Sequence, residues 1–247
     1  GRTYIRCDDR DLGNIDVRAA VDRFIAGRVS VSYGLLAELT VDDKYRPGDL
    51  ARVGSRAVGV SVRVLGPDWV EADRIRLYSN GQLIRDEPIT SLTDRESGVL
   101  WTGKWTIELP SHDVHLVAIA SGPGVNGLYW KTAKPYQPTS PIWEPQVFSC
   151  TGAIWLDVDG DGRKTSAYDY AQQLFLANAG NVEQLLASLD KFDQAVATQA
   201  ASLFQSSGRS WLDADVQKLL RKASPATQAG VQSYLNAWRA NQLATPD

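Results

Sequence analysis

The chain has 247 residues, of which 43% are hydrophobic, and this length and composition are enough for two compact units with cores of their own. The formal net charge of −3 gives no electrostatic basis for binding nucleic acid or an anionic membrane, and no apolar run approaches the roughly 18 residues that span a bilayer. Because the chain starts at Gly1 and contains no Met, we expect a processed product or an excised piece, from which a targeting segment could have been removed.

The first fifty residues predict one short helix followed by strands. Asp16 can cap a helix over 16–26, and Gly27 can end it. The apolar residues that fall on one face of this helix are Val17, Ala20, Val21, Phe24 and Ile25. After Gly27 the period of the apolar residues changes to two, which indicates extended chain.

The middle of the chain predicts an antiparallel sheet structure. Val58, Val60, Val62 and Val64 alternate with other residues, as in a strand with one buried face. Asn80-Gly81 separates two apolar runs and predicts a two-residue hairpin turn. Further strands are expected at Lys104–Leu109, Val114–Ala120 and Val147–Leu156. We therefore predict a β-rich α+β fold with an antiparallel, immunoglobulin-like β-sandwich over residues 51–162.

The composition changes after Gly162 to one rich in Ala, Gln and Leu, which predicts a small helical C-terminal unit over residues 163–247. Ser166-Ala167-Tyr168-Asp169 has the spacing of a capping box, so a helix should begin there. Helical periodicity continues through Gln172–Asn178 and Val182–Phe204. Shorter helices are expected at Asp213–Lys222 and Pro225–Asn241, which makes three or four helices in all.

One acidic stretch carries the clearest chemical signal. In Leu156-Asp157-Val158-Asp159-Gly160-Asp161-Gly162 three carboxylates alternate, and a glycine follows the third. A Ca²⁺ loop takes oxygen ligands from alternating positions and turns sharply at such a glycine. The closing position, where a bidentate Glu is usual, holds Tyr168, and Asp169 lies one place later. The predicted ligands of a structural Ca²⁺ are Asp157, Asp159, Asp161, the Arg163 carbonyl, Thr165 and Asp169. The alternative is an acidic turn that only caps the following helix.

Two other residue types invite a functional interpretation. His112 and His115 are the only histidines, but at this spacing on a strand they point to opposite faces, which argues against a shared ion. Cys7 and Cys150 lie far apart in no metal-type pair, so two buried free thiols are expected, with a disulfide as the alternative in an exported protein.

The chain contains eight Trp, and these predict either core packing or an aromatic surface for sugars. Trp130 and Trp143 flank the Pro-rich stretch 134–141, which we expect to be the best exposed surface for a glycan ligand. No carboxylate pair is marked by an apolar pocket that would raise one pKa for general-acid catalysis.

The order of several segments resembles a known family. The first group is Arg2-Thr3-Tyr4-Ile5, Ala26-Gly27-Arg28, Gly34-Leu35-Leu36 and Pro47-Gly48-Asp49. The second group is Val62–Gly66, Asp73–Leu83, Val114–Ala120, Thr139-Ser140-Pro141-Ile142 and Ile154–Gly162. Together they resemble the C-terminal half of bacterial PHP-type (polymerase-and-histidinol-phosphatase) metallohydrolases of the carbaryl-hydrolase-like branch.

The resemblance implies an accessory region rather than an enzyme. PHP-type active sites use a cluster of His and Asp ligands, which would lie upstream of Gly1, and two histidines cannot supply it. Residues 1–50 would then be the closing segment of the upstream metallohydrolase domain of the same polypeptide. A free-standing Ca²⁺-dependent binding module, with a glycan as its ligand, is the second hypothesis, and a self-contained hydrolase using a carboxylate pair is the third. A periplasmic or secreted location is favoured.

Overall fold

The computed structural model describes residues 1–8, 10–11, 13–90, 98–127, 130–133, 144–178 and 181–244. The chain forms two compact units. Unit 1 contains Gly1–Glu108 and His115–Leu156, and unit 2 contains Leu109–Val114 and Asp157–Asp247. The predicted division at residue 50 is therefore replaced by a single unit, because strands on both sides of that residue share the same sheets.

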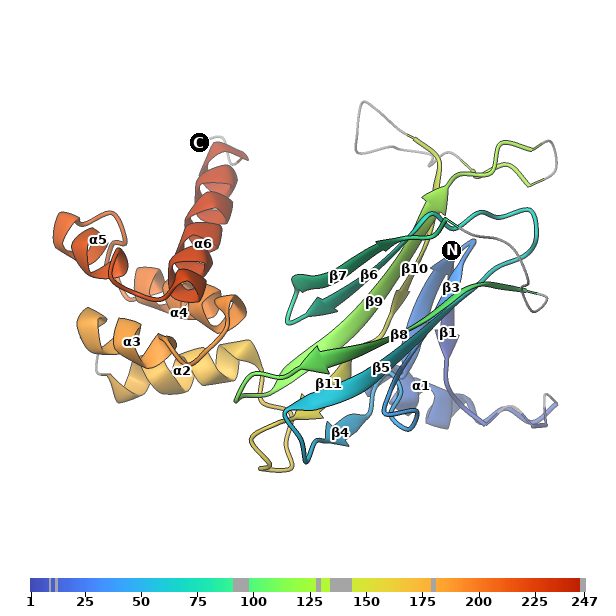
Figure 1. The fold of residues 1–247 in the computed structure, drawn as a ribbon, viewed down its shortest axis with the longest axis horizontal. Helices are drawn as coiled ribbons and strands as arrows, with labels where there is room; N and C mark the ends of the chain where they lie inside the picture. The colour runs from blue at the N-terminus through green and yellow to red at the C-terminus, as the bar shows by residue number, and fades with distance from the viewer. Residues whose placement is uncertain are drawn as a thin grey trace. The chain divides into compact units, whose positions relative to one another are not determined.

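The elements of unit 1 are eleven strands and one helix among the described residues (Figure 1). They are β1 (Arg2–Ile5), α1 (Val17–Ile25), β2 (Val29–Tyr33), β3 (Leu36–Val41), β4 (Leu50–Arg52), β5 (Ala57–Leu65), β6 (Arg74–Ser79), β7 (Gln82–Pro88), β8 (Val99–Glu108), β9 (Val114–Pro123), β10 (Gln146–Thr151) and β11 (Ile154–Asp157). The expected strand over 147–156 is two strands, because the chain passes through Gly152 and Ala153 without continuing the ladder.

Within the described part of the chain these strands form an eight-stranded sheet and a three-stranded sheet. The larger sheet runs β1-β2-β10-β9-β11-β4, and the β6–β7 hairpin joins it through β9. The smaller sheet runs β3-β5-β8, and both of its pairings are antiparallel. The antiparallel architecture predicted from the period-two pattern is therefore confirmed.

The core of unit 1 follows directly from the alternation in sequence. Along β5 the side chains of Val58, Val60, Val62 and Val64 are buried, while their neighbours are more exposed. Val60, Val62 and Val64 pair with apolar residues of β3, such as Leu39 opposite Val62, and Val58 pairs with Ile107 of β8. Ser149 is buried between strands and satisfies its hydroxyl by accepting from the Ala37 amide (2.9 Å) and donating to the Val31 carbonyl (2.8 Å).

Helix α1 forms where the sequence predicts it, but its apolar face is exposed. The Asp16 carboxylate accepts from the Ala19 amide, and Gly27 follows the helix with a φ of 75°. None of its residues is buried. Val17 is 71% exposed and Ile25 is 77% exposed, so this helix contributes little to the core of unit 1.

Unit 2 contains five helices among the described residues: α2 (Ala167–Ala177), α3 (Val182–Leu189), α4 (Gln194–Ser206), α5 (Ala214–Leu220) and α6 (Pro225–Ala244). The capping box at Ser166 is confirmed, since its hydroxyl accepts from the Asp169 amide and the Asp169 carboxylate accepts from the Ser166 amide. The continuous helix expected over 182–204 is broken before Asp193, which caps α4 by accepting from the Val196 amide (3.0 Å).

Small residues bring α4 and α6 close together in unit 2. A Cβ on Gly230 would lie 2.5 Å from the Cβ of Ala197, so only glycine allows this approach. Trp211 is completely buried, contacts Phe204 with a centroid distance of 4.4 Å, and donates its indole N–H to the Ala201 carbonyl. This tryptophan serves packing, as one of the two sequence interpretations predicts.

Two other expectations can be compared with the structure. Cys7 and Cys150 are free and both are partly exposed rather than buried. Within the described residues, none of the helices has the length and apolar character needed to cross a bilayer.

The hairpin turn provides a test of the fold. Asn80 and Gly81 have φ values of 46° and 79°, and Ser79 pairs with Gln82, so this is the predicted two-residue turn. Gly81→Ala should lower the free energy of unfolding by about 1 kcal/mol, because an L side chain disfavours positive φ. Urea unfolding measures the change. Gly54→Ala, at a site where an added Cβ meets no atom within 4 Å, is the control; an equal loss in both variants would contradict the turn assignment.

Candidate metal centre

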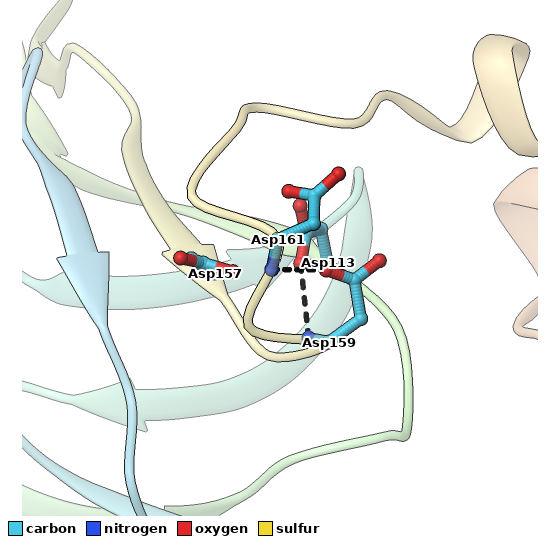
Figure 2. Close-up of side chains that lie close together, drawn as sticks. All are labelled: Asp113, Asp157, Asp159 and Asp161. Atoms are coloured by element: carbon cyan, nitrogen blue, oxygen red, sulfur yellow. Dashed lines mark hydrogen bonds between the residues drawn. The ribbon is translucent and has the colours of Figure 1, made fainter.

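Four carboxylates converge at the loop between β11 and α2 (Figure 2). Asp157, Asp159 and Asp161 come from the alternating run, and Asp113 comes from the Leu109–Val114 segment of the same unit. One oxygen from each lies within 4.8 Å of the others. Asp113 and Asp157 are buried, at 1% and 2% exposure, whereas Asp159 and Asp161 are exposed.

Asp157 and the two glycines determine the turn of the loop. The Asp157 carboxylate accepts from the Gly160 amide (2.9 Å) with one oxygen and from the Gly162 amide (3.0 Å) with the other. Gly160 and Gly162 have φ values of 79° and 77°, a region that residues with a Cβ rarely adopt. The chain therefore winds around the Asp157 carboxylate, and the D-x-D-x-D-G spacing is what permits this winding.

Asp113 binds the same loop from a position far away in sequence. Its carboxylate accepts from the amides of Val158 (2.8 Å), Asp159 (3.4 Å) and Thr165 (3.1 Å). Burial raises the pKa of Asp113 above its usual value, and the three amide hydrogen bonds only partly oppose this. Without a bound ion, protonated Asp113 stabilises the folded protein at low pH. This contribution is lost as the pH rises from the pKa of Asp113 in the unfolded chain to its higher pKa in the folded protein.

Tyr170 of α2 connects two members of the group. Its hydroxyl donates to the Asp159 carboxylate (2.6 Å) and accepts from the Asp113 amide (3.1 Å). Burial, together with the hydrogen bond to Asp159, raises the pKa of Tyr170, so the phenol stays neutral and remains a donor at physiological pH. The Tyr170 side chain thus ties α2 to the acidic loop.

This arrangement can hold a hard cation. The hydrogen-bond donors to the four carboxylates in these contacts are backbone amides and the Tyr170 phenol. These donors are neutral, so they occupy carboxylate lone pairs but leave the negative charge uncompensated. In a Ca²⁺ site with oxygen ligands at about 2.4 Å, two oxygens on opposite sides of the ion are about 4.8 Å apart. The observed spread of the four oxygens is compatible with that geometry.

The structure brings three of the four predicted carboxylates together and places the fourth, Asp169, elsewhere. Asp169 is not in the group, because its carboxylate accepts from the amide and the hydroxyl of Ser166. The amide of Arg163 donates to Asp161, and that of Thr165 donates to Asp113, so both residues lie in the loop beside the carboxylates. Asp113 was missed because no local pattern connects it with a loop more than forty residues later.

Neither histidine belongs to a metal cluster. Across the described residues, the four aspartates are the only group of three or more His, Cys, Asp or Glu side chains with suitable geometry. His112 is buried, with Nε2 3.3 Å from an Asp193 carboxylate oxygen. His115 contacts the ring of Trp155 at a centroid distance of 5.1 Å.

A pair of exposed tryptophans lies in unit 1. Trp69 and Trp130 stack with ring centroids 4.6 Å apart and an interplanar angle of 19°. They are 50% and 58% exposed. The predicted partner of Trp130 across the Pro-rich stretch, Trp143, lies outside the described residues, as does the stretch 134–141 itself.

Comparison of the chain with protein-family models, with curated proteins and with solved structures finds no match.

The Tyr170 hydroxyl provides a test of the site. Tyr170→Phe should lower the free energy of unfolding of unit 2 by about 1–2 kcal/mol in the absence of added metal, because the Asp113 amide loses its acceptor and Asp159 loses a donor. Chemical denaturation followed by far-UV circular dichroism measures this. Tyr168→Phe is the matched control, since Tyr168 is 45% exposed on the same helix. Equal stability of the two variants would show that the hydroxyl does not support the loop.

Proposed function

We propose that this chain is a non-catalytic accessory region of a bacterial PHP-type metal-dependent hydrolase, and that its acidic loop binds a structural Ca²⁺. In this proposal the two antiparallel sheets form an immunoglobulin-like sandwich. The ion is bound by Asp113, Asp157, Asp159 and Asp161, and the Arg163 carbonyl and Thr165 add further oxygens. Asp169 keeps its place in the capping box.

The convergence of four carboxylates carries the calcium part of the proposal. Two of them are buried, and bringing like charges together in a buried place disfavours the ionised forms. A divalent cation removes this cost, and all the ligands on offer are hard oxygens, which favours Ca²⁺ over Zn²⁺. Asp113 supplies the closing carboxylate that the loop itself lacks.

Two further observations support an accessory role. The acidic group contains no histidine, whereas the PHP-type cluster that the resemblance implies uses several. Helix α1 presents Val17, Val21, Phe24 and Ile25 to solvent, and an exposed apolar stripe of this kind suits a surface that packs against another domain. We propose that the upstream metallohydrolase domain of the same polypeptide covers it. A periplasmic or secreted location suits a site that depends on Ca²⁺.

Calcium should raise the melting temperature of the protein. Binding to the folded state alone adds RT ln(1 + [L]/Kd), or about 2.7 kcal/mol when Ca²⁺ is at 100 times its Kd. The measurement is a thermal melt in millimolar Ca²⁺ against a melt in chelator. Asp159→Ala should abolish the difference between the two melts, whereas Asp215→Ala, an exposed carboxylate of the same unit, should preserve it.

The choice of closing ligand is tested in the same way. Asp113→Asn should remove the Ca²⁺-dependent shift, and Asp169→Asn should retain it while lowering the stability through the weakened cap. An unchanged melting temperature of the native protein in Ca²⁺ would leave helix capping as the role of the loop.

A Ca²⁺-dependent glycan-binding module is the second candidate, and the stacked Trp69–Trp130 pair favours it. The two stacked rings cover each other's inner faces, and an outer indole face that is exposed can bind the apolar face of a sugar ring. Retention on insoluble cellulose, chitin or xylan tests this candidate: Trp69→Ala and Trp130→Ala should each lose it, and Tyr168→Ala, an exposed aromatic of unit 2, should not. Failure of the native chain to bind any of the three polymers would refute it.

A further inference from the structure

A half-open groove of about 880 Å³ lies in unit 1, far in sequence from the acidic loop. The outward side of the β3-β5-β8 sheet contributes Glu38, Thr40, Ser61 and Arg63, which alternate with the buried residues of those strands. Residues of β1 and β2 and the Arg46-Pro47 turn line the rest. Its volume is within the range of small-molecule sites.

The charged groups of the sheet surface are paired with one another. Arg63 contacts Glu38 (3.2 Å), and Lys104 contacts Asp43 (3.4 Å). The Ser61 hydroxyl donates to Asp43 (3.0 Å), and Thr40 and Thr102 add hydroxyls without charge. This part of the groove is thus nearly neutral and rich in hydrogen-bonding groups, which suits hydroxyls rather than a continuous polyanion.

Around Asp49 the balance of charge is different. Arg6 binds this carboxylate with two nitrogens, at 2.6 and 3.2 Å, and Arg28 approaches it at 3.6 Å. The Arg46 amide donates to the same carboxylate (3.0 Å). Burial opposes ionisation of Asp49, but hydrogen bonds from Arg6 and the Arg46 amide outweigh it and lower the pKa, so the group is charged at neutral pH.

The guanidiniums of Arg6 and Arg28 therefore face one carboxylate. Arg46 adds a third positive residue to the lining of the groove, so positive charge is in excess here. Arg6 donates to Asp49 through both of its terminal nitrogens. Arg28 has one long contact and keeps other N–H donors. Arg46 also lines the groove and makes no ion pair with any residue that the structure describes. Arginine presents its donors in a planar fork that matches an oxyanion.

We propose that this groove binds a small ligand that carries one carboxylate or phosphate group, bound by Arg28 and Arg46, and hydroxyls that contact the sheet surface. This site is independent of the calcium loop and of the proposed accessory role, because all of its residues belong to unit 1. The acidic side chains Glu38 and Asp43 disfavour a ligand with charges along its whole length.

The test uses three probes that share a hydroxylated ring: glucose 6-phosphate, glucuronate and glucose. Amide chemical shifts of the native chain are followed by NMR during each titration, once with Ca²⁺ and once with chelator. At least one of the two anions should shift the amides of Arg28 and Arg46 and bind about tenfold more tightly than glucose, at either Ca²⁺ level. Comparison of the two anions identifies the oxyanion, and added salt should weaken the binding.

Arg46→Ala and Arg28→Gln should each raise the Kd of that anion about tenfold. Arg56→Ala, an exposed arginine outside the groove, is the control and should leave the Kd unchanged. Because Arg46 is itself exposed, its variant should keep the native spectrum and so report on binding alone. Equal affinity for glucose and both anions, no shift with any probe, or an equal loss in Arg56→Ala would overturn the proposal.

Discussion

The buried carboxylate of Asp113 is the constraint on which the acidic loop depends. Three backbone amides of the loop donate to it, and the Asp113 amide is in turn bound by the Tyr170 hydroxyl. Since Tyr170 also donates to Asp159, the Leu109–Val114 segment, the loop and α2 form one hydrogen-bonded network. Removal of the Asp113 carboxylate leaves three loop amides without this acceptor, and removal of the Tyr170 hydroxyl leaves the buried Asp113 amide without one. Loss of either group should therefore destabilise the whole network.

Repulsion among the four carboxylates is the reason for proposing a divalent cation as the ligand of this network. Neutral donors can orient four carboxylates but cannot remove their mutual repulsion, and the raised pKa of Asp113 reflects the cost of keeping it charged in a buried place. A bound divalent cation would replace that cost with attraction. Folding of unit 2 and ion binding are then coupled, because the unfolded chain does not bring Asp113 to the loop.

Unit 1 also contains charge that its own residues do not balance, but here the excess charge is positive. The Asp49 carboxylate faces the side chains of Arg6 and Arg28, and the excess positive charge borders a groove whose other side is nearly neutral. Helix α1 has a different unsatisfied feature: its apolar stripe is exposed to solvent and no residue of the helix is buried. The groove has uncompensated positive charge, and α1 has uncovered apolar side chains. Each is therefore a candidate surface for binding a ligand or a partner.

The sequence by itself determined the local elements: the period-two strands, the turn at Asn80-Gly81, the caps at Asp16 and Ser166, and the turning of the acidic run. These depend on contacts within a few residues, which spacing alone specifies. Only the tertiary structure brought Asp113 to the loop, assigned Asp169 to capping, and exposed the apolar face of α1. Such outcomes depend on which distant segments pair, and a periodic pattern states that a face is apolar without stating what covers it.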